Sequence, residues 1–276
     1  PALKVAAFGM SKIVKQFPYK RNSKQFDAEV MFKNLQDYTM RNQKNDITVN
    51  DTPVKLRFLD LPENRMKFDP SFFGLPEYKD NKFVNIVYTS EQYGLYNTLS
   101  DLFVENVRMR CTVAGRNSPM QEWSNKAHLY VSELKSKKRD ISLHNLREAL
   151  YADKSVKECS SHRPTLITNF IQGVNKNPDE NTVIFDPFAG WGDRLLGSMA
   201  VSKNRPITYF ATDLNVNLRH GHEAMVERLG KKLNIEVDIK YDDVRNVSTR
   251  HLDGVTDLVF TSPPYFKYED YNMSTN

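Results

Sequence analysis

The chain has 276 residues with a formal net charge of +5, and 39% of its residues are hydrophobic. This composition excludes a globally disordered chain, and the length is enough for one large domain or two ordinary ones. The small basic excess slightly favours polyanionic partners. Cys111 and Cys159 lack the spacing of a disulfide framework or a zinc site, and no apolar run approaches the ~20 residues of a membrane-spanning helix. We therefore expect an intracellular, cytoplasmic protein with no membrane association.

The chain before residue 156 divides into a basic arm and a longer mixed region. Residues 1–26 carry six Lys or Arg and no acidic residue, which is typical of a solvated terminus or of an arm that contacts phosphates. Residues 27–155 combine helical and strand patterns without a repeat. Within them, 89–103 has one apolar helical face, and Ser142 can cap a helix that follows it. We expect this region to be an auxiliary or nucleic-acid-recognition unit.

From residue 156 onward, strand and helix patterns alternate. Apolar runs at 183–185, 209–211 and 258–260 are typical of strands inside a parallel sheet, whereas 235–241 alternates apolar and charged residues like an edge strand. We therefore predict an α/β fold with a Rossmann-like parallel sheet, in which the strands lie in the order third, second, first, fourth. In such a sheet ligands bind beyond the carboxyl ends, here where the first and fourth strands meet.

Two unusual loops follow those two strands. The first, DPFAGWG at residues 186–192, has glycines that permit a sharp turn and close approach of a ligand, but it lacks the G-x-G-x-x-G spacing of dinucleotide-binding loops. The second, TSPPY at 261–265, ends an apolar strand in two prolines. Asp186, Asp213 and Asp243 each follow a predicted strand, and together they describe a pocket for a cationic adenosine derivative. Taken singly, each acid also suits a loop or cap residue.

The sequences FDPFAGWGDRLL and TSPPY together resemble the class I S-adenosylmethionine-dependent methyltransferases that act on exocyclic amino groups of nucleic-acid bases. The resemblance covers residues 160–271 and extends to methyltransferase-like sequences of viral and phage genomes, so a nuclear or viral compartment is open as well. It implies a catalytic domain over 156–276, S-adenosyl-L-methionine as cofactor, no metal, and DNA as partner with RNA as an alternative. By this resemblance the cofactor is held by Asp186, Pro187, Phe188, Ala189, Gly190, Trp191, Gly192, Asp213, Asp243, Arg163 and Thr165.

The same resemblance makes Ser262, Pro263, Pro264 and Tyr265 the catalytic loop, which holds the target amine. Its serine slightly favours N4 of cytosine over N6 of adenine. An exocyclic amine is a poor nucleophile because its lone pair is delocalised, and the rigid prolines offer carbonyl acceptors without competing N–H donors. The Ser262 hydroxyl is a further acceptor, and Tyr265 can stack on a base rotated out of its duplex. Methylation of a DNA base is therefore our leading functional hypothesis.

The sheet of this family normally has seven strands, whereas four are predicted here. We therefore expect that the C-terminal part of the sheet is missing from this chain, or that a protein partner or a second copy of the chain completes it. Two alternatives to a DNA methyltransferase stay open. One is a catalytically inactive scaffold or nucleic-acid-binding subunit with the same fold, and the other is a methyltransferase that acts on RNA or on a protein glutamine.

Overall fold

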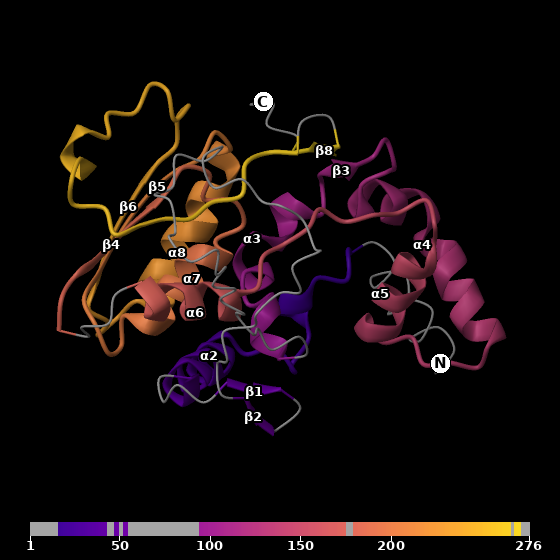
Figure 1. Cartoon of the computed structure of the whole chain (residues 1–276). Helices are drawn as coiled ribbons and strands as arrows, with labels where there is room; N and C mark the ends of the chain where they lie inside the picture. Colours follow the sequence, from indigo (N-terminus) through magenta and orange to yellow (C-terminus); the bar gives the residue numbers. More distant parts are fainter. Residues whose placement is uncertain are drawn as a thin grey trace, which may run out of the picture.

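The computed structural model describes residues 16–42, 47–49, 52–54, 94–174, 179–265 and 268–271. The described chain is a mixed α/β structure in which a parallel sheet packs against helices (Figure 1). The first 15 residues of the predicted basic arm lie outside the described residues. No helix of the described part is long and apolar enough to cross a membrane.

The central sheet has four parallel strands, β4 (Thr182–Asp186), β5 (Ile207–Thr212), β6 (Ile235–Lys240) and β7 (Leu258–Val259). Their order is β6-β5-β4-β7, which confirms the predicted order of third, second, first and fourth strand. β6 lies at one edge, as its alternating sequence predicts. β7 lies at the other edge of the described sheet rather than inside it. The Val259 side chain is 60% exposed because no described strand pairs with the outer side of β7.

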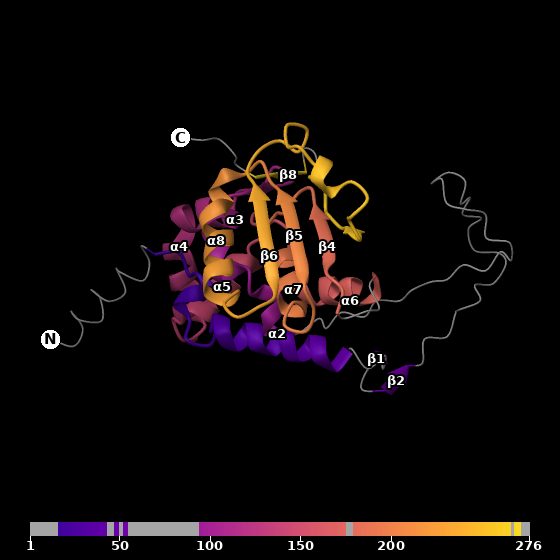
Figure 2. The same ribbon diagram turned by 90° about the vertical axis from the view of Figure 1, so that its left-hand side faces the viewer.

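Helices α6 (Pro164–Val174), α7 (Asp193–Val201) and α8 (Arg219–Leu229) lie on one face of the sheet, and Figure 2 looks onto the opposite face. The chain passes through α7 between β4 and β5 and through α8 between β5 and β6, moving in one direction along the sheet. Crossovers of the usual right hand in one direction put both helices on the same face. Every residue of α7 is buried, because the helix is enclosed by the sheet, by α6 and by α2 (Ala28–Asn42). Helix α3 (Asp101–Arg108) packs against α8.

The helices that precede the sheet in sequence share its hydrophobic core. Leu35, Leu99 and Val104 belong to the same buried cluster as Leu195 of α7. Their apolar side chains are therefore removed from water by contact with the sheet-packing helices. The predicted boundary at residue 155 does not separate two cores in this structure.

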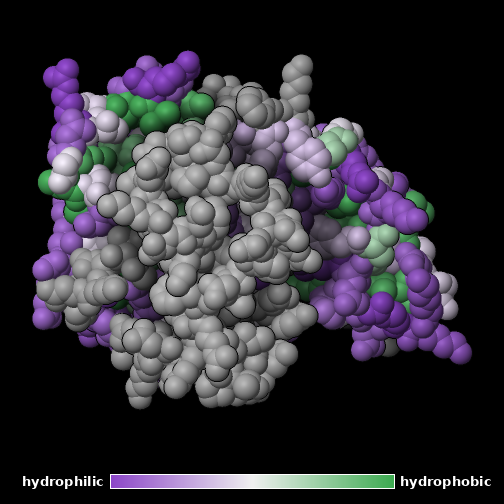
Figure 3. Space-filling model, viewed as in Figure 1, coloured by the Kyte–Doolittle hydropathy of each residue, from purple (hydrophilic) through white to green (hydrophobic). Residues whose placement is uncertain are grey.

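A second core lies between α4 (Pro119–Ser136) and α5 (Leu143–Ala152). Its centre includes Trp123, and Figure 3 shows mainly hydrophilic residues on the outside of these two helices. Ser142 caps α5 by accepting a hydrogen bond from the Asn145 amide at 3.2 Å, as the sequence predicts. The α4–α5 pair is thus the part of the predicted auxiliary region that has its own core.

The remaining elements are short. Strand β3 (Thr112–Val113) pairs antiparallel with β8 (Glu269–Asp270), so the chain that follows the two prolines returns to the helices encoded before the sheet. Strands β1 (Ile47–Val49) and β2 (Thr52–Val54) form a separate hairpin pair. The 3₁₀ helices are η1 (Lys20–Asn22), η3 (Leu95–Thr98), η4 (Val216–Leu218) and η5 (Arg250–Leu252).

Candidate functional site

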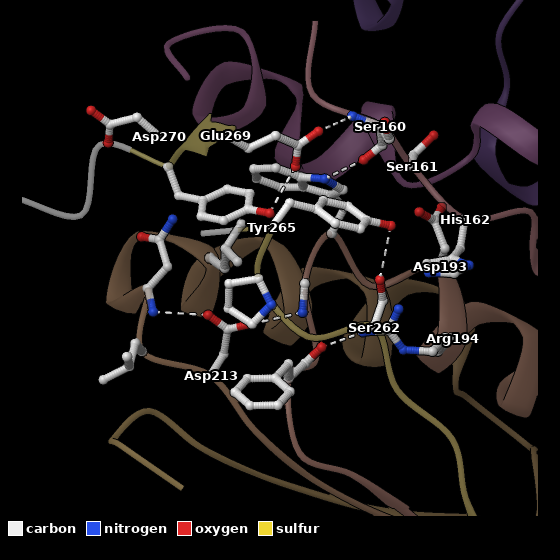
Figure 4. Close-up of a pocket in the computed structure, with 18 residues that line it drawn as sticks. Ser160, Ser161, His162, Asp193, Arg194, Asp213, Ser262, Tyr265, Glu269 and Asp270 are labelled. Carbon is white, nitrogen blue, oxygen red and sulfur yellow. Dashed lines mark hydrogen bonds between the residues drawn. The ribbon is translucent and has the colours of Figure 1, made fainter. Parts of the chain in front are cut away.

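The glycine turn (residues 186–192) and the proline corner (residues 262–265) border a single cavity of about 550 Å³ (Figure 4). The cavity lies beyond the carboxyl ends of β4 and β7, the neighbouring parallel strands that lead into the two loops. Gly190 and Trp191 of the glycine turn and Tyr265 of the proline corner are part of its wall. The expectation that both loops meet at one site is confirmed.

The glycine turn needs its two glycines for different reasons. Gly190 and Gly192 have φ angles of 58° and 84°, in the left-handed region that L side chains disfavour. Gly192 is the N-cap of α7 and lies behind the cavity wall. A Cβ atom on Gly192 would be 2.7 Å from Sδ of Met225 and 3.1 Å from Cδ2 of His222. The turn can therefore approach α8 this closely only without a side chain at that position.

His222 of α8 holds the glycine turn in place. Its Nε2 lies 2.9 Å from the Gly190 carbonyl oxygen, and its Nδ1 lies 2.8 Å from the Tyr241 hydroxyl. Burial lowers the pKa of His222 to about 4, so the ring is neutral at pH 7. Because a carbonyl oxygen only accepts, Nε2 carries the proton and donates to Gly190, and Nδ1 accepts from Tyr241. From the sequence alone, one can see only that His222 lies on the same face of this helix as the apolar residues.

Asp186 is a structural residue rather than a wall of the cavity. Its carboxylate is fully buried and accepts hydrogen bonds from Arg194 Nε at 2.6 Å and from the Tyr209 hydroxyl at 2.7 Å. Arg194, by contrast, lines the cavity. The expectation that Asp186 accepts bonds from a ligand is therefore wrong, because an arginine eight residues further along the chain satisfies its carboxylate first.

Asp213 lines the cavity, as the sequence predicts, but its carboxylate already has partners. Oδ2 accepts a bond from the Gly190 amide at 2.7 Å, and Oδ1 accepts one from the Asn215 amide at 2.8 Å. Burial raises the pKa of Asp213 to about 6. The residue thus ties the end of β5 to the glycine turn, and each oxygen keeps a second lone pair for a ligand.

Two residues that the sequence motifs do not single out line this cavity and carry buried polar atoms without a partner in the described part of the chain. Asp193 is 2% exposed and Asn215 is 3% exposed, and both line the wall. Among the described residues, Asp193 Oδ1 and Asn215 Nδ2 are buried without a hydrogen-bond partner. The only signal in the sequence is proximity: Asp193 directly follows the glycine turn, and Asn215 comes two residues after Asp213.

The wall opposite the sheet comes from segments far apart in the chain. Trp191 Nε1 donates to the Ser160 carbonyl at 2.9 Å, and the Ser160 amide donates to Glu269 Oε1 at 3.0 Å. The Tyr271 hydroxyl donates to the other oxygen of Glu269 at 2.7 Å, and its ring lies 5.9 Å from that of Trp191. Strand β8 therefore closes this side of the cavity, as Figure 4 shows for Glu269 and Ser160.

The proline corner is open to solvent on its outer side. The Ser262 and Tyr265 hydroxyls lie 3.3 Å apart, and the Tyr265 side chain is 48% exposed. Pro264 lines the cavity together with these two residues, whereas Pro263 is not part of its wall. The Thr261 hydroxyl, just before the corner, is buried without a partner among the described residues. The corner thus combines hydroxyl groups with an accessible aromatic ring.

Three further predicted cofactor residues, outside the glycine turn, also lie away from the cavity wall. Thr165 is fully buried in α6, where its hydroxyl donates to Asn97 Oδ1 at 3.0 Å. Arg163 is exposed just before α6, and Asp243 forms an ion pair with Arg245 at the surface. The predicted grouping of three strand-end acids around one pocket is therefore wrong, because two of them are paired with arginines instead.

The other residues of the glycine turn stabilise the conformation of the loop. The Pro187 carbonyl accepts from the Thr212 hydroxyl at 2.5 Å, and the Ala189 amide donates to the Thr212 carbonyl at 2.8 Å. Phe188 lies between them and lines the cavity. These bonds fasten the turn to the carboxyl end of β5, so the wall is formed before any ligand arrives.

The described residues contain no group of three or more His, Cys, Asp or Glu side chains that could hold a metal ion. Comparison of the chain with models of protein families, with curated proteins and with solved structures found no match. A functional assignment therefore depends on the sequence motifs and on the geometry of the cavity.

Proposed function

We propose that the protein transfers a methyl group from S-adenosylmethionine to an exocyclic amino group of a DNA base, with N4 of cytosine ahead of N6 of adenine. The observation that carries the proposal is the shared cavity, because the two loops that resemble those of amino-methyltransferases border one space. Its volume of about 550 Å³ lies in the range of small-molecule and cofactor sites.

In the proposed complex the cofactor lies against the glycine turn. Asp213 is fixed by two backbone amides and keeps lone pairs that can accept from ribose hydroxyls. Asn215 Nδ2 is a free donor on the same wall. Phe188, Leu214 and Leu218 add apolar surface that suits an adenine ring. These features support binding of an adenosine derivative at the carboxyl end of β5.

The chemistry that we propose needs positioning more than it needs an acid or a base. The amine nitrogen attacks the methyl carbon while the carbon–sulfur bond breaks, so the electrons of that bond stay on sulfur and S-adenosylhomocysteine leaves. The methylated nitrogen then loses a proton to water on the solvent-exposed side of the cavity. The Ser262 hydroxyl and the Pro264 carbonyl can accept hydrogen bonds from the amino group and orient its lone pair. Holding the two reactants in line supplies the rate gain.

The exposure of the proline corner supports a macromolecular acceptor. Tyr265 lines the cavity, and its side chain is 48% exposed to solvent. A base that leaves its duplex can stack on such a ring, and stacking on an aromatic side chain contributes about 1–3 kcal/mol. A small metabolite would gain nothing from an aromatic side chain that is half outside the site.

The test is methyl transfer from S-adenosylmethionine labelled in its methyl group. Duplex DNA, single-stranded DNA, RNA and a glutamine-containing peptide are offered side by side, and the products are digested and identified by mass spectrometry. We expect N4-methylcytosine from DNA. Detection of N6-methyladenine alone would overturn the preference for cytosine, and labelled RNA or peptide alone would overturn DNA as the acceptor. Cofactor binding without transfer to any acceptor would favour an inactive scaffold.

A further inference from the structure

The side chain of Asp193 is an unexplained feature of the cavity. It is the first residue of α7 and is 2% exposed, and its Oδ1 atom has no hydrogen-bond partner among the described residues. Ser100 supplies a side-chain hydrogen bond to this carboxyl, so the unpaired atom is Oδ1 alone. A buried carboxylate whose charge meets no cation is unfavourable unless it is protonated. Asp193 also lines the cavity, so a ligand in the cavity lies next to this residue.

The two arginines that act on Asp193, Arg108 and Arg194, already form hydrogen bonds with other carboxylates. Arg108 donates to both oxygens of Asp101, at 2.8 Å and 2.7 Å, and to the Cys159 carbonyl at 2.9 Å. Arg194 is bonded to Asp186 at 2.6 Å. The pKa of Asp193 is raised to about 7, first by burial and then by Asp101, while Ser100, Arg108 and Arg194 oppose the rise. In the free protein, the charged form of the Asp193 carboxyl is therefore unfavourable.

The position of Asp193 identifies the part of a ligand that it faces. In Figure 4, Asp193 lies beside His162, toward the end of the cavity opposite Asp213. The Asp213 end offers an acceptor and the free Nδ2 donor of Asn215, a combination that suits hydroxyl groups and ring nitrogens. At the other end, the unpaired Oδ1 of Asp193 is an anionic acceptor, which suits a cationic donor.

S-Adenosylmethionine carries two positive charges, and they differ in hydrogen bonding. The sulfonium has no N–H or O–H group, whereas the α-ammonium of the amino-acid end has three N–H donors. We propose that Asp193 binds this α-ammonium and thereby fixes which end of the cavity receives the amino-acid part. The inference rests on the proposed function and assigns to the site a residue that the motif resemblance does not include. A charge-assisted bond of this kind contributes about 1.5–3 kcal/mol.

The test compares two ligands with two variants by calorimetry at pH 8. S-Adenosylhomocysteine contains the amino-acid end, and 5′-methylthioadenosine has the same adenosine and thioether without it. We expect Asp193→Asn to weaken the binding of S-adenosylhomocysteine about 10- to 100-fold, which corresponds to the loss of a charge-assisted bond. The affinity for 5′-methylthioadenosine should stay within about twofold of the wild-type value. The matched variant Asn215→Ala changes the other end of the cavity, so it should weaken the binding of both ligands to the same extent.

A second measurement on the wild-type protein does not depend on the folding of any variant. An S-adenosylhomocysteine analogue that lacks only the amino group should bind the wild type about 10- to 100-fold more weakly than the parent ligand. Equal weakening of both ligands by Asp193→Asn, or an analogue that binds as tightly as its parent, would overturn the role of Asp193. If the wild type binds neither S-adenosylhomocysteine nor 5′-methylthioadenosine, the proposed function itself fails and the inference fails with it.

Discussion

The two loops that border the cavity differ in how completely the rest of the chain holds them. In the glycine turn, the Gly190 amide and carbonyl are bonded to Asp213 and His222, and the neighbouring Asp186 is buried against Arg194. In the proline corner, the side chains reach solvent, and Tyr265 is 48% exposed. One loop is thus part of the core, and the other is part of the surface.

This difference matches the different sizes of the two proposed substrates. A small cofactor is bound well by a wall that is already rigid, because little entropy is lost on binding. A nucleic acid is too large to enter the protein, so the loop that receives its base must stay accessible. The comparison predicts that substitutions in the glycine turn change stability and binding together, whereas those in the proline corner change transfer alone.

The largest expected effect is that of Asp186→Asn. The substitution leaves the Arg194 guanidinium buried without its anion, and breaking a buried ion pair in this way costs about 3–5 kcal/mol. Urea unfolding of the free protein measures the loss. Asp243→Asn, which removes one partner of the surface pair with Arg245, is the control and should change stability little. A loss no greater than that of the control would show that Asp186 does not fasten the turn.

Gly192→Ala should have the next largest effect. The new methyl group would lie 2.7 Å from Met225 Sδ and 3.1 Å from His222 Cδ2 in a backbone with a φ angle of 84°, so strain and overpacking together cost about 2–5 kcal/mol. Gly115 has a φ angle of 69° and open space around its Cβ position, so Gly115→Ala measures the strain alone, about 1–2 kcal/mol. Equal losses for the two variants in thermal unfolding would contradict close packing of the turn on α8.

Asp193→Asn should stabilise the free protein at pH 8. Burial raises the pKa of this carboxyl from 3.8 to about 7, so its charged form costs ~4 kcal/mol above pH 7. The buried amide retains a cost of about 1–3 kcal/mol, which leaves a net gain of about 1–3 kcal/mol. Below about pH 4 both the folded and the unfolded chain carry the proton, so the gain disappears as the pH falls from 7 to 4.

Urea unfolding of the Asp193→Asn variant and the wild type across that pH range measures the difference between them. The exposed Asp140→Asn variant is the control, and it should show no such pH-dependent gain. Destabilisation by Asp193→Asn at pH 8 would mean that the hydrogen bond from Ser100 to the carboxylate outweighs the cost of burying its charge.

The smallest effect on stability is expected at the proline corner. Tyr265→Ala should change the free energy of unfolding by no more than about 0.5 kcal/mol, because the side chain is half exposed. S-Adenosylhomocysteine affinity should stay the same, and methyl transfer to DNA should fall about 10- to 100-fold with the lost stacking. Tyr268→Ala is the matched control, since Tyr268 is 47% exposed and lies outside the cavity wall. Equal loss of transfer in both variants would contradict a specific role for Tyr265.

The strand order and the meeting of the two loops could be predicted because they depend on local patterns. Apolar runs and their alternation set the strand positions, and the handedness of crossovers then places the loops after β4 and β7 side by side. The inward turn of Asp186 could not be predicted, because it depends on Arg194 and Tyr209 meeting it in three dimensions. A strand-end acid has the same sequence signature whether it faces a ligand or an arginine.

The rest of the site depends on contacts between segments far apart in sequence. His222 reaches Gly190 across 32 positions, and Glu269 reaches Ser160 across 109. Such pairs leave no spacing pattern in a single sequence. The buried, unpaired atoms of Asp193 and Asn215 are likewise visible only when the packing around them is known.

We propose that one cavity, between a fixed glycine turn and an accessible proline corner, receives the cofactor. A crystal structure of the protein with S-adenosylhomocysteine would locate the ligand. We expect electron density for it in this cavity, with the ribose beside Asp213 and the amino-acid end beside Asp193. Ligand bound elsewhere on the molecule, or a cavity that stays empty at saturating ligand concentration, would contradict the proposal.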